Sequence, residues 1–254
     1  MIDTAPRLAS FYRLVALDEA DSTNAEAQRR AASGAPAGTL IWARRQTAGR
    51  GRRGRAWQSP PGNLAFSLLL RPAVAPAAAA TLGFVAGLAL VDAIDGLLPA
   101  GRSSRLKWPN DVLVDGRKLA GILLESEGAR ADRLDALILG LGVNLASHPP
   151  ESEFPATDLR SACGVDLAPD ALLADFAARL EAWMQRLAAD GFAPLRAAWR
   201  ARAHGLGRPI RVRLPRETLT GIFADLDAAG FLLLDAPGGR RLVSAGDVFF
   251  DSLV

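Results

Sequence analysis

The longest apolar stretch of the chain, residues 82–98, limits the folds that this sequence can adopt. It carries Asp92 and Asp95 and is too short to cross a bilayer comfortably, so it does not predict a membrane span. We predict instead one long buried helix over residues 76–97. A chain of 254 residues, half of them hydrophobic, is long enough to bury such a helix in a sizeable core.

Strand patterns lie on both sides of this helix. Strands are predicted at residues 11–17, 39–44, 64–70, 105–108, 112–114, 118–125 and 134–143. Further helices are predicted at residues 24–32, 168–189 and 194–204. Ser22 or Thr23 can cap the first of them, and Thr23 with Glu26 fits a capping box. Because strands and helices do not alternate regularly, we expect an α+β fold, a mixed β-sheet packed with helices.

The residues after Gly207 change to the two-residue alternation that is typical of strands. Ile210, Val212 and Leu214 would point to one side, and glycine-bearing turns would join the strands that follow. About 45 residues of hairpins make a small barrel that is stable only when it packs on a larger domain. We therefore expect two domains, residues 1–206 and residues 207–254.

Cysteine and histidine usage argues against several kinds of site. The single Cys163 excludes an internal disulfide and a multi-thiolate metal site, and the isolated His148 and His204 give little support to zinc. No amino-terminal segment has the order of a signal peptide. We expect a cytoplasmic protein with no membrane partner.

Residues 44–55, called the arginine segment below, contain six arginines and no acidic residue. This local charge favours an anionic partner, whether nucleic acid, nucleotide phosphate or carboxylate. Gly49, Gly51 and Gly54 would let the backbone approach such a ligand closely. Neither a Walker loop nor a dinucleotide fingerprint is present. By itself, the segment also fits a solvated basic loop or a non-specific nucleic-acid arm.

Lysine is rare, because Lys107 and Lys118 are the only lysines among 30 basic residues. A lysine is a compact charge that reaches a phosphate oxygen without the geometric demands of a guanidinium fork. A predicted hairpin brings Lys118 near Asp111. On spacing alone, the pair equally fits an exposed ion pair worth about 0 to 1 kcal/mol.

Five segments together resemble, in order and spacing, the motifs of biotin protein ligases, also called biotin-(acetyl-CoA-carboxylase) ligases. They are residues 21–24, 46–52, 107–111, 117–121 and 140–144. The resemblance implies a class II synthetase-like catalytic domain of the biotin/lipoate-ligase type over residues 1–206 and an SH3-like domain over residues 207–254.

The same resemblance implies an ATP-dependent ligase. Such an enzyme forms biotinyl-5′-AMP from biotin and ATP, then transfers biotin to a lysine of a biotin carboxyl carrier protein, the biotinyl domain of acetyl-CoA carboxylase or a related carboxylase. Bifunctional family members have a helix-turn-helix domain before the first motif. Since only 21 residues precede Ser22, we expect no specific DNA binding.

The resemblance also implies roles for individual residues. Those expected to bind biotin are Ser22, Thr23, Asn24, Gln46, Gly49, Arg50, Gly51, Arg52, Lys118, Gly121, Leu123, Gly140 and Gly142. Those expected to bind ATP are Arg50, Arg52, Arg55, Trp57, Asn110, Lys118 and Asn144, with adenine packed on the tryptophan. The expected catalytic residues are Lys118, Arg52 and Asp111.

The charge of the reactants explains why this reaction needs a basic site. Biotin's carboxylate must attack the α-phosphate of ATP although both are anionic, so Arg50, Arg52 and Lys118 should screen the repulsion, together with Mg2+ bound to ATP. Asp111 is a candidate contact for the magnesium. It is also expected to orient the carrier lysine or to accept its proton.

Two other functions also fit parts of the sequence. A lipoate ligase or a lipoyl/octanoyl transferase shares the catalytic fold, although residues 46–52 and 107–111 argue against it. A non-catalytic nucleic-acid-binding protein would use the arginine segment and would bind duplex with a steep salt dependence. Exposed strand edges are compatible with a homodimer.

Overall fold

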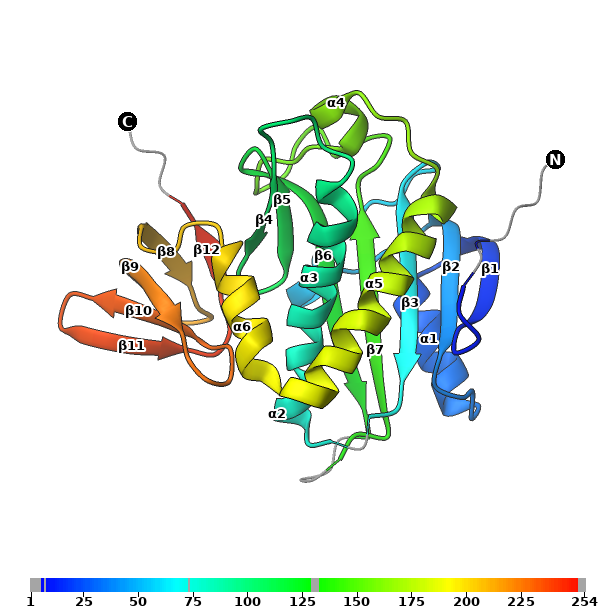
Figure 1. The fold of residues 1–254 in the computed structure, drawn as a ribbon, viewed down its shortest axis with the longest axis horizontal. Coiled ribbons are helices and arrows are strands. Elements are labelled where there is room, and N and C mark those ends of the chain that lie inside the picture. Colours follow the sequence, from blue (N-terminus) through cyan, green and yellow to red (C-terminus); the bar gives the residue numbers. More distant parts are fainter. Residues whose placement is uncertain (1–5, 7, 73, 129–132, 251–254) are drawn as a thin grey trace.

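The computed structural model describes residues 6, 8–72, 74–128 and 133–250, which form a larger and a smaller part (Figure 1). The larger part is built on a seven-stranded sheet in the order β1-β2-β3-β7-β6-β5-β4. Its strands are β1 (Arg13–Ala20), β2 (Thr39–Gln46), β3 (Leu64–Leu70), β4 (Ser104–Lys107), β5 (Asp111–Val114), β6 (Arg117–Glu127) and β7 (Ala136–Val143). β1 and β2 are parallel and the other neighbours are antiparallel. The predicted fold class, a mixed sheet packed with helices, is confirmed.

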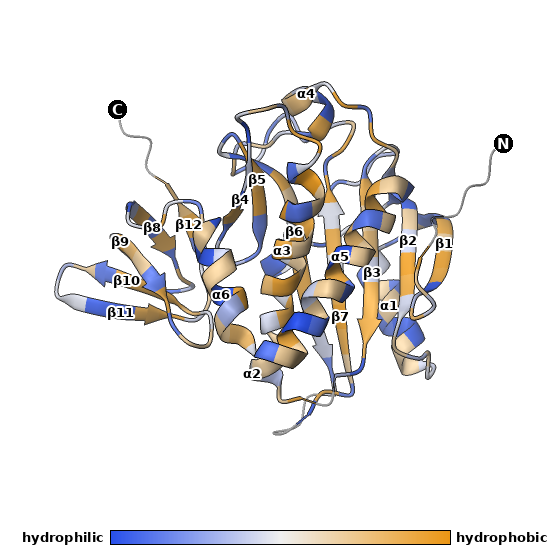
Figure 2. Ribbon diagram, in the orientation of Figure 1, coloured by the Kyte–Doolittle hydropathy of each residue, from blue (hydrophilic) through white to orange (hydrophobic). Residues whose placement is uncertain are grey.

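Helices cover both faces of the sheet. α3 (Thr81–Asp95) and α5 (Pro169–Asp190) lie on one face, where Leu40 and Leu68 belong to the main core. α1 (Thr23–Ala32) lies on the other face, where Ile41 and Leu69 pack with Ala27. Because the central strands are covered on both sides, they are apolar almost continuously, as Figure 2 shows for β2 and β3.

The long helix expected at residues 76–97 is in fact two helices, α2 (Pro76–Ala79) and α3. At the junction, the hydroxyl of Thr81 donates to the carbonyl of Ala78 at 2.6 Å. It thus competes with the backbone N–H groups that would donate to the same carbonyl in a continuous helix. α3 is buried along most of its length. Within the part of the chain that the structure describes, no helix has both the length and the apolar character needed to traverse a bilayer.

The capping box predicted at the start of α1 is wrong. Ser22 is the N-cap, and its hydroxyl accepts from the backbone N–H of Ala25 at 3.5 Å. Thr23 is already helical and turns its hydroxyl to Gln46, while Glu26 pairs with arginines of the next turn. The threonine therefore faces the site described below and takes no part in capping.

The smaller part is an antiparallel sheet of five strands in the order β11-β10-β9-β8-β12. Its strands are β8 (Pro209–Arg213), β9 (Thr218–Leu226), β10 (Leu232–Ala236), β11 (Gly239–Val243) and β12 (Asp247–Phe249). β12 was not predicted. α4 (Leu159–Cys163) lies at the top of the larger part as drawn, and α6 (Phe192–Ala201) lies between the two parts (Figure 1).

The two parts are packed together by a buried hydrogen bond, a half-exposed ion pair and a shared apolar core. Trp108, 2% exposed, donates its indole N–H to the carbonyl of Gly230 at 3.0 Å. Arg200 of α6 pairs with Asp225 of β9 at 2.6 Å. One apolar cluster also runs through both parts, so the small sheet has the support that its size requires.

Candidate active site

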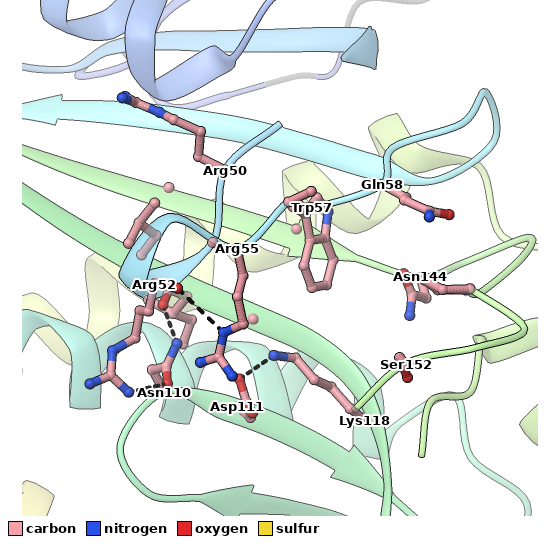
Figure 3. A pocket seen from close by; sticks show the side chains of 18 of the residues that line it. Arg50, Arg52, Arg55, Trp57, Gln58, Asn110, Asp111, Lys118, Asn144 and Ser152 are labelled. Carbon is pink, nitrogen blue, oxygen red and sulfur yellow. Dashed lines mark hydrogen bonds and ion pairs between the residues drawn. The ribbon is translucent and has the colours of Figure 1, made fainter. Parts of the chain in front are cut away.

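A cavity of about 360 Å3 collects the predicted site residues from separate segments (Figure 3). Those that line it are Ser22, Thr23, Asn24, Gln46, Arg50, Gly51, Arg52, Arg55, Trp57, Asn110, Asp111, Lys118, Gly121, Leu123, Gly140, Gly142 and Asn144. Gly49 lies just behind the wall, where a Cβ atom would come within 2.4 Å of the carbonyl oxygen of Trp57. The structure therefore brings the whole set together, and the role of each residue stays a prediction.

Glycines on two neighbouring strands form the floor of the cavity. Gly121 of β6 and Gly142 of β7 are cross-strand partners. A Cβ atom on Gly142 would lie 2.3 Å from the indole nitrogen of Trp57, and one on Gly140 would lie 2.0 Å from Oδ1 of Asn24. No side chain fits at either position, because Trp57 and Asn24 rest directly on the backbone.

The end of the cavity beside α1 is a network of amide and hydroxyl groups. Gln46 accepts from the backbone N–H of Thr23 at 2.8 Å and from its hydroxyl at 3.1 Å. Asn24 donates to Glu125 at 2.7 Å, and its oxygen lies 2.5 Å from the hydroxyl of Ser67. These side chains are thus held in place before any ligand arrives, which suits recognition of a polar head group.

Sequence reasoning missed Ser67 and Glu125. Ser67 is fully buried in the middle of β3, whose other residues are all apolar. A lone hydroxyl in such a strand is the signal that could have identified it, because a buried polar group needs a partner. Glu125 carried no such signal, since β6 is partly exposed where it lies.

The arginine segment closes one side of the cavity. Arg50 donates to Gln28 at 3.0 Å and to Glu125 at 3.2 Å. Arg52 donates to the side-chain oxygen of Asn110 at 3.1 Å, as Figure 3 shows. Burial lowers the pKa of Arg52, and the nearby Asp247 partly offsets the effect. A guanidinium keeps its charge under such a shift, so Arg52 remains cationic.

Two acids from distant segments hold Arg53 and Arg55, at the end of the arginine segment. Asp247 of β12, 4% exposed, pairs with Arg55 at 2.8 Å and with Arg53 and Arg213 at 3.1 Å each. Glu153 pairs with Arg55 at 3.1 Å and with Arg213 at 2.5 Å. Burial alone would raise the pKa of Asp247, but its guanidinium partners outweigh burial and lower it. The small sheet therefore supports one wall of the site through its ion pairs with Arg55, without lining the cavity itself.

Residues 149–156 form a further wall that the sequence did not identify. Ser152, Glu153 and Phe154 of this segment line the cavity. The ring of Phe154 stacks on Phe249 of the small sheet, with the ring centroids 4.9 Å apart. Asn144 holds the end of the segment by donating to the carbonyl of Thr157 at 3.1 Å.

Lys118 and Asp111 meet at the centre of the cavity. A bulge between β5 and β6, where the register shifts at residues 112–113, turns Lys118 toward Asp111. Its Nζ lies 2.6 Å from Oδ1 of Asp111 and 5.6 Å from the centre of the Trp57 ring (Figure 3). Because the Asp111 side chain is only 10% exposed, the exposed ion pair considered from spacing is wrong.

The surroundings of Asp111 do not suit a metal ligand. Lys118 and Lys107 both approach its carboxylate, the second at 3.9 Å, and their charges oppose a cation. Among the described residues, no three side chains of histidine, cysteine, aspartate or glutamate are grouped to hold a metal ion. His148 instead pairs with Asp158 at 2.5 Å.

Two family models match the chain in the regions just described. Residues 17–144 match the Biotin/lipoate A/B protein ligase family, and residues 205–251 match the Biotin protein ligase C terminal domain. The chain is also 44% identical over 241 residues to a biotin-(acetyl-CoA-carboxylase) ligase of Paracoccus denitrificans, a match that covers 92% of this chain and 99% of the relative. The chain belongs to the biotin protein ligase family.

Other biotin protein ligases resemble this member of the family in sequence and in fold. The bifunctional ligase/repressor BirA of Bacillus subtilis is 34% identical, over 92% of this chain and 73% of the relative. The structure of the biotin protein ligase from Aquifex aeolicus in complex with biotin and ATP matches with a TM-score of 0.81 and 29% identity, over 93% of this chain and 97% of that one. The small sheet corresponds to the SH3-like domain expected from the sequence.

Proposed function

We propose that this chain is an ATP-dependent biotin protein ligase. It forms biotinyl-5′-AMP from biotin and ATP and transfers the biotin to a lysine of a biotin carboxyl carrier protein. The observation that carries the proposal is one cavity that combines three features. It has polar side chains at the end beside α1, a floor of glycines, and a cationic wall that contains Lys118, Arg50 and Arg52. Family membership and the relatives named for biotin ligation support the same assignment.

The order of groups along the cavity suits a bicyclic ureido acid better than a plain acyl chain. The network around Asn24 and Gln46 offers both donors and acceptors at one end. The floor of Gly140 and Gly142 admits a flat ligand, and Lys118 lies farther along, where the carboxylate of such a ligand would be. A lipoyl group carries no hydrogen-bonding head that would use the Asn24 end.

Adenylation brings two anions together, and the cationic wall reduces this cost. As biotin's carboxylate oxygen bonds to the α-phosphorus, pyrophosphate leaves and negative charge spreads over the phosphoryl oxygens. We assign Lys118, Arg50 and Arg52 to stabilise that charge. Arg55 and Trp57 are assigned to the nucleotide, with Asn110 and Asn144 beside them.

In the transfer step, the neutral amine of the carrier lysine attacks the biotinyl carbonyl of the adenylate and AMP leaves. Asp111 is the acid assigned to this step, either to orient the amine or to accept its proton. Magnesium is proposed to enter with the phosphates of ATP, since the ammonium groups beside Asp111 disfavour a site built on that carboxylate.

The remaining assignments are proposals of the same kind. We divide the chain into a catalytic domain, residues 1–206, and an SH3-like domain, residues 207–254. The proposed location is the cytoplasm and the proposed partner is a biotinyl domain, with no specific DNA and no membrane. A homodimer would use the edge of the large sheet at β1, because residues 202–204 already pair with Leu106 of β4, the other outer strand.

Biotin-dependent exchange of radiolabelled pyrophosphate into ATP tests the proposal. Wild-type protein is expected to exchange with biotin and not with lipoate. Lys118→Ala should reduce the exchange about 100-fold or more, because it removes a charge that contacts the reacting groups. Arg117→Ala is the matched control, since Arg117 is the neighbouring cation and is exposed outside the cavity. Exchange with lipoate, or with neither acid, would overturn the assignment.

A further inference from the structure

Lys107, the lysine that was given no part in the proposed reaction, lies directly behind the site. It ends β4 and is the cross-strand partner of Asp111 in the β4–β5 hairpin, so both side chains project from one face of the sheet. The Lys107 side chain is 6% exposed and does not line the cavity. Its Nζ is 3.9 Å from Oδ2 of Asp111, whereas Lys118 approaches Oδ1.

Aromatic rings enclose this ammonium group. The ring centre of Phe154 is 3.5 Å from Nζ of Lys107, and that of Phe250 is 6.0 Å away. A cation over the face of an aromatic ring is stabilised by the ring quadrupole, which partly replaces the lost water. Because Phe154 also stacks on Phe249, the small sheet supports the enclosure.

Every charge that faces Lys107 bears on its ionisation. Burial is the largest influence and lowers the pKa of Lys107 to about 8, with Lys118 and Arg55 acting in the same direction. Asp111 and Asp247 oppose the change. His204 also packs nearby, and burial together with the Lys107 charge lowers the pKa of this histidine. The acid closest to Lys107 in this set is Asp111, which makes the pair the central interaction.

We propose that Lys107 is a positioning residue, whose ammonium group fixes one oxygen of Asp111 so that the other oxygen holds Lys118 above the glycine floor. The inference rests on the proposed function, because it concerns the same adenylation reaction. A carboxylate held at one oxygen can rotate, whereas one held at both cannot. The two ammonium groups also fix the orientation of the Asp111 carboxylate, which favours an orienting role for it in the transfer step.

The proposal predicts a specific kinetic pattern for Lys107→Met, a substitution that keeps the length and apolar stem of the side chain. In biotin-dependent pyrophosphate exchange at pH 7, kcat should fall about tenfold, while KM for biotin stays within about twofold, because Lys107 does not line the cavity. Arg105→Met is the matched control, since Arg105 is an exposed cation on the same strand and should keep wild-type kinetics.

The pH profile separates positioning from a merely structural role. Lys107 supports Asp111 only while it is protonated, so wild-type exchange should decline as pH rises through about 8. Lys107→Arg keeps its charge and should restore much of the activity at pH 7 without that decline. Lys107→Met should be slow throughout and lack the decline.

A direct reading of the lysine does not depend on activity. Because the chain has two lysines, protein labelled with 13C at the lysine ε-carbon gives two side-chain signals, and Lys107→Met assigns them. The signal of Lys107 should titrate near pH 8 and should move to lower pH in Asp111→Asn, which removes the favourable acid.

Three results would overturn the inference and leave the proposed function intact. The first is an exchange rate in Lys107→Met equal to that of wild type. The second is a loss of activity in Lys107→Met that an increase in KM for biotin explains completely. The third is a pKa of Lys107 that is the same in wild type and in Asp111→Asn. If Lys107→Met fails to fold, the arginine variant and the titration of the wild-type protein still decide the question. Absence of exchange in wild-type protein would instead refute the proposed function.

Discussion

The substitution Gly140→Ala tests whether the glycine floor positions the polar end of the cavity. The added Cβ would lie 2.0 Å from Oδ1 of Asn24 and 2.8 Å from its Cγ. Since such contacts are not found below 3.0 Å, the amide must move by about 1 Å or more. It has little room to do so, because Ser67, the cross-strand partner of Gly140, supports its oxygen at 2.5 Å.

The expected magnitude follows from these contacts. Displacing Asn24 weakens its hydrogen bonds to Ser67 and Glu125, each worth about 1 kcal/mol net. Crowding in a packed site adds about 1 to 3 kcal/mol. The free energy of unfolding should therefore fall by about 2 to 5 kcal/mol, which a domain with about 5 to 15 kcal/mol of stability survives. If Asn24 binds the ligand head, loss of one or two hydrogen bonds should raise Kd for biotin about 10- to 100-fold.

Titration calorimetry with biotin and urea unfolding measure the two effects on one protein sample. Gly96→Ala is the control, because Gly96 follows α3 with φ −67° and has no atom within 4 Å of an added Cβ. That variant should bind biotin normally and unfold at the same or slightly higher urea concentration. The reasoning about the floor is refuted if Gly140→Ala binds biotin within about twofold of wild type.

Three further predictions concern the other walls of the site. Asp247→Asn should lower the free energy of unfolding by about 1 to 3 kcal/mol in urea and raise KM for ATP, because it removes a buried carboxylate from partly exposed arginines. The pKa of Lys107 is about 8 in the folded protein, whereas its ordinary value is 10.5. Between these pH values the unfolded chain therefore binds more protons than the folded protein. Stability should therefore rise with pH across this range by about 3 kcal/mol or less, and Lys107→Met should flatten the rise in urea unfolding curves. Trypsin should cleave the arginine segment more slowly with biotin and ATP together than with neither, and equal cleavage rates would contradict a role for that segment in binding.

The fold class was accessible from sequence for local reasons, whereas the residues of the cavity were expected from the family resemblance. Strands buried on both faces, such as β3, are almost continuous apolar runs, and glycines occur in the strands where a side chain approaches the backbone closely. The five motifs that carry the resemblance lie in separate segments of the sequence, and strand pairing makes some of their residues neighbours in the sheet. Gly121 and Gly142 illustrate this, since they lie 21 positions apart in sequence and opposite each other in β6 and β7.

The parts that sequence reasoning missed depend on packing between distant segments. Nothing near Asp247 shows that it will be buried beside arginines almost 200 positions earlier, because β12 has only three residues. The break between α2 and α3, where the hydroxyl of Thr81 donates to the carbonyl of Ala78, was likewise not indicated by the apolar pattern. Lys107 was noticed for its rarity, but only the structure places its ammonium group behind Asp111.

The two ends of the cavity differ in how they are prepared for a ligand. The floor is backbone, so its shape is fixed by the pairing of β6 and β7 and changes little when a ligand binds. The cationic wall instead consists of guanidinium groups already paired with Glu125, Glu153 and Asp247. Arg50 and Arg55 are about 40% exposed, so exchanging a carboxylate for a phosphate costs little there. Substitutions in the floor should consequently change affinity for biotin through sterics and be insensitive to salt, whereas ATP binding should weaken as ionic strength rises.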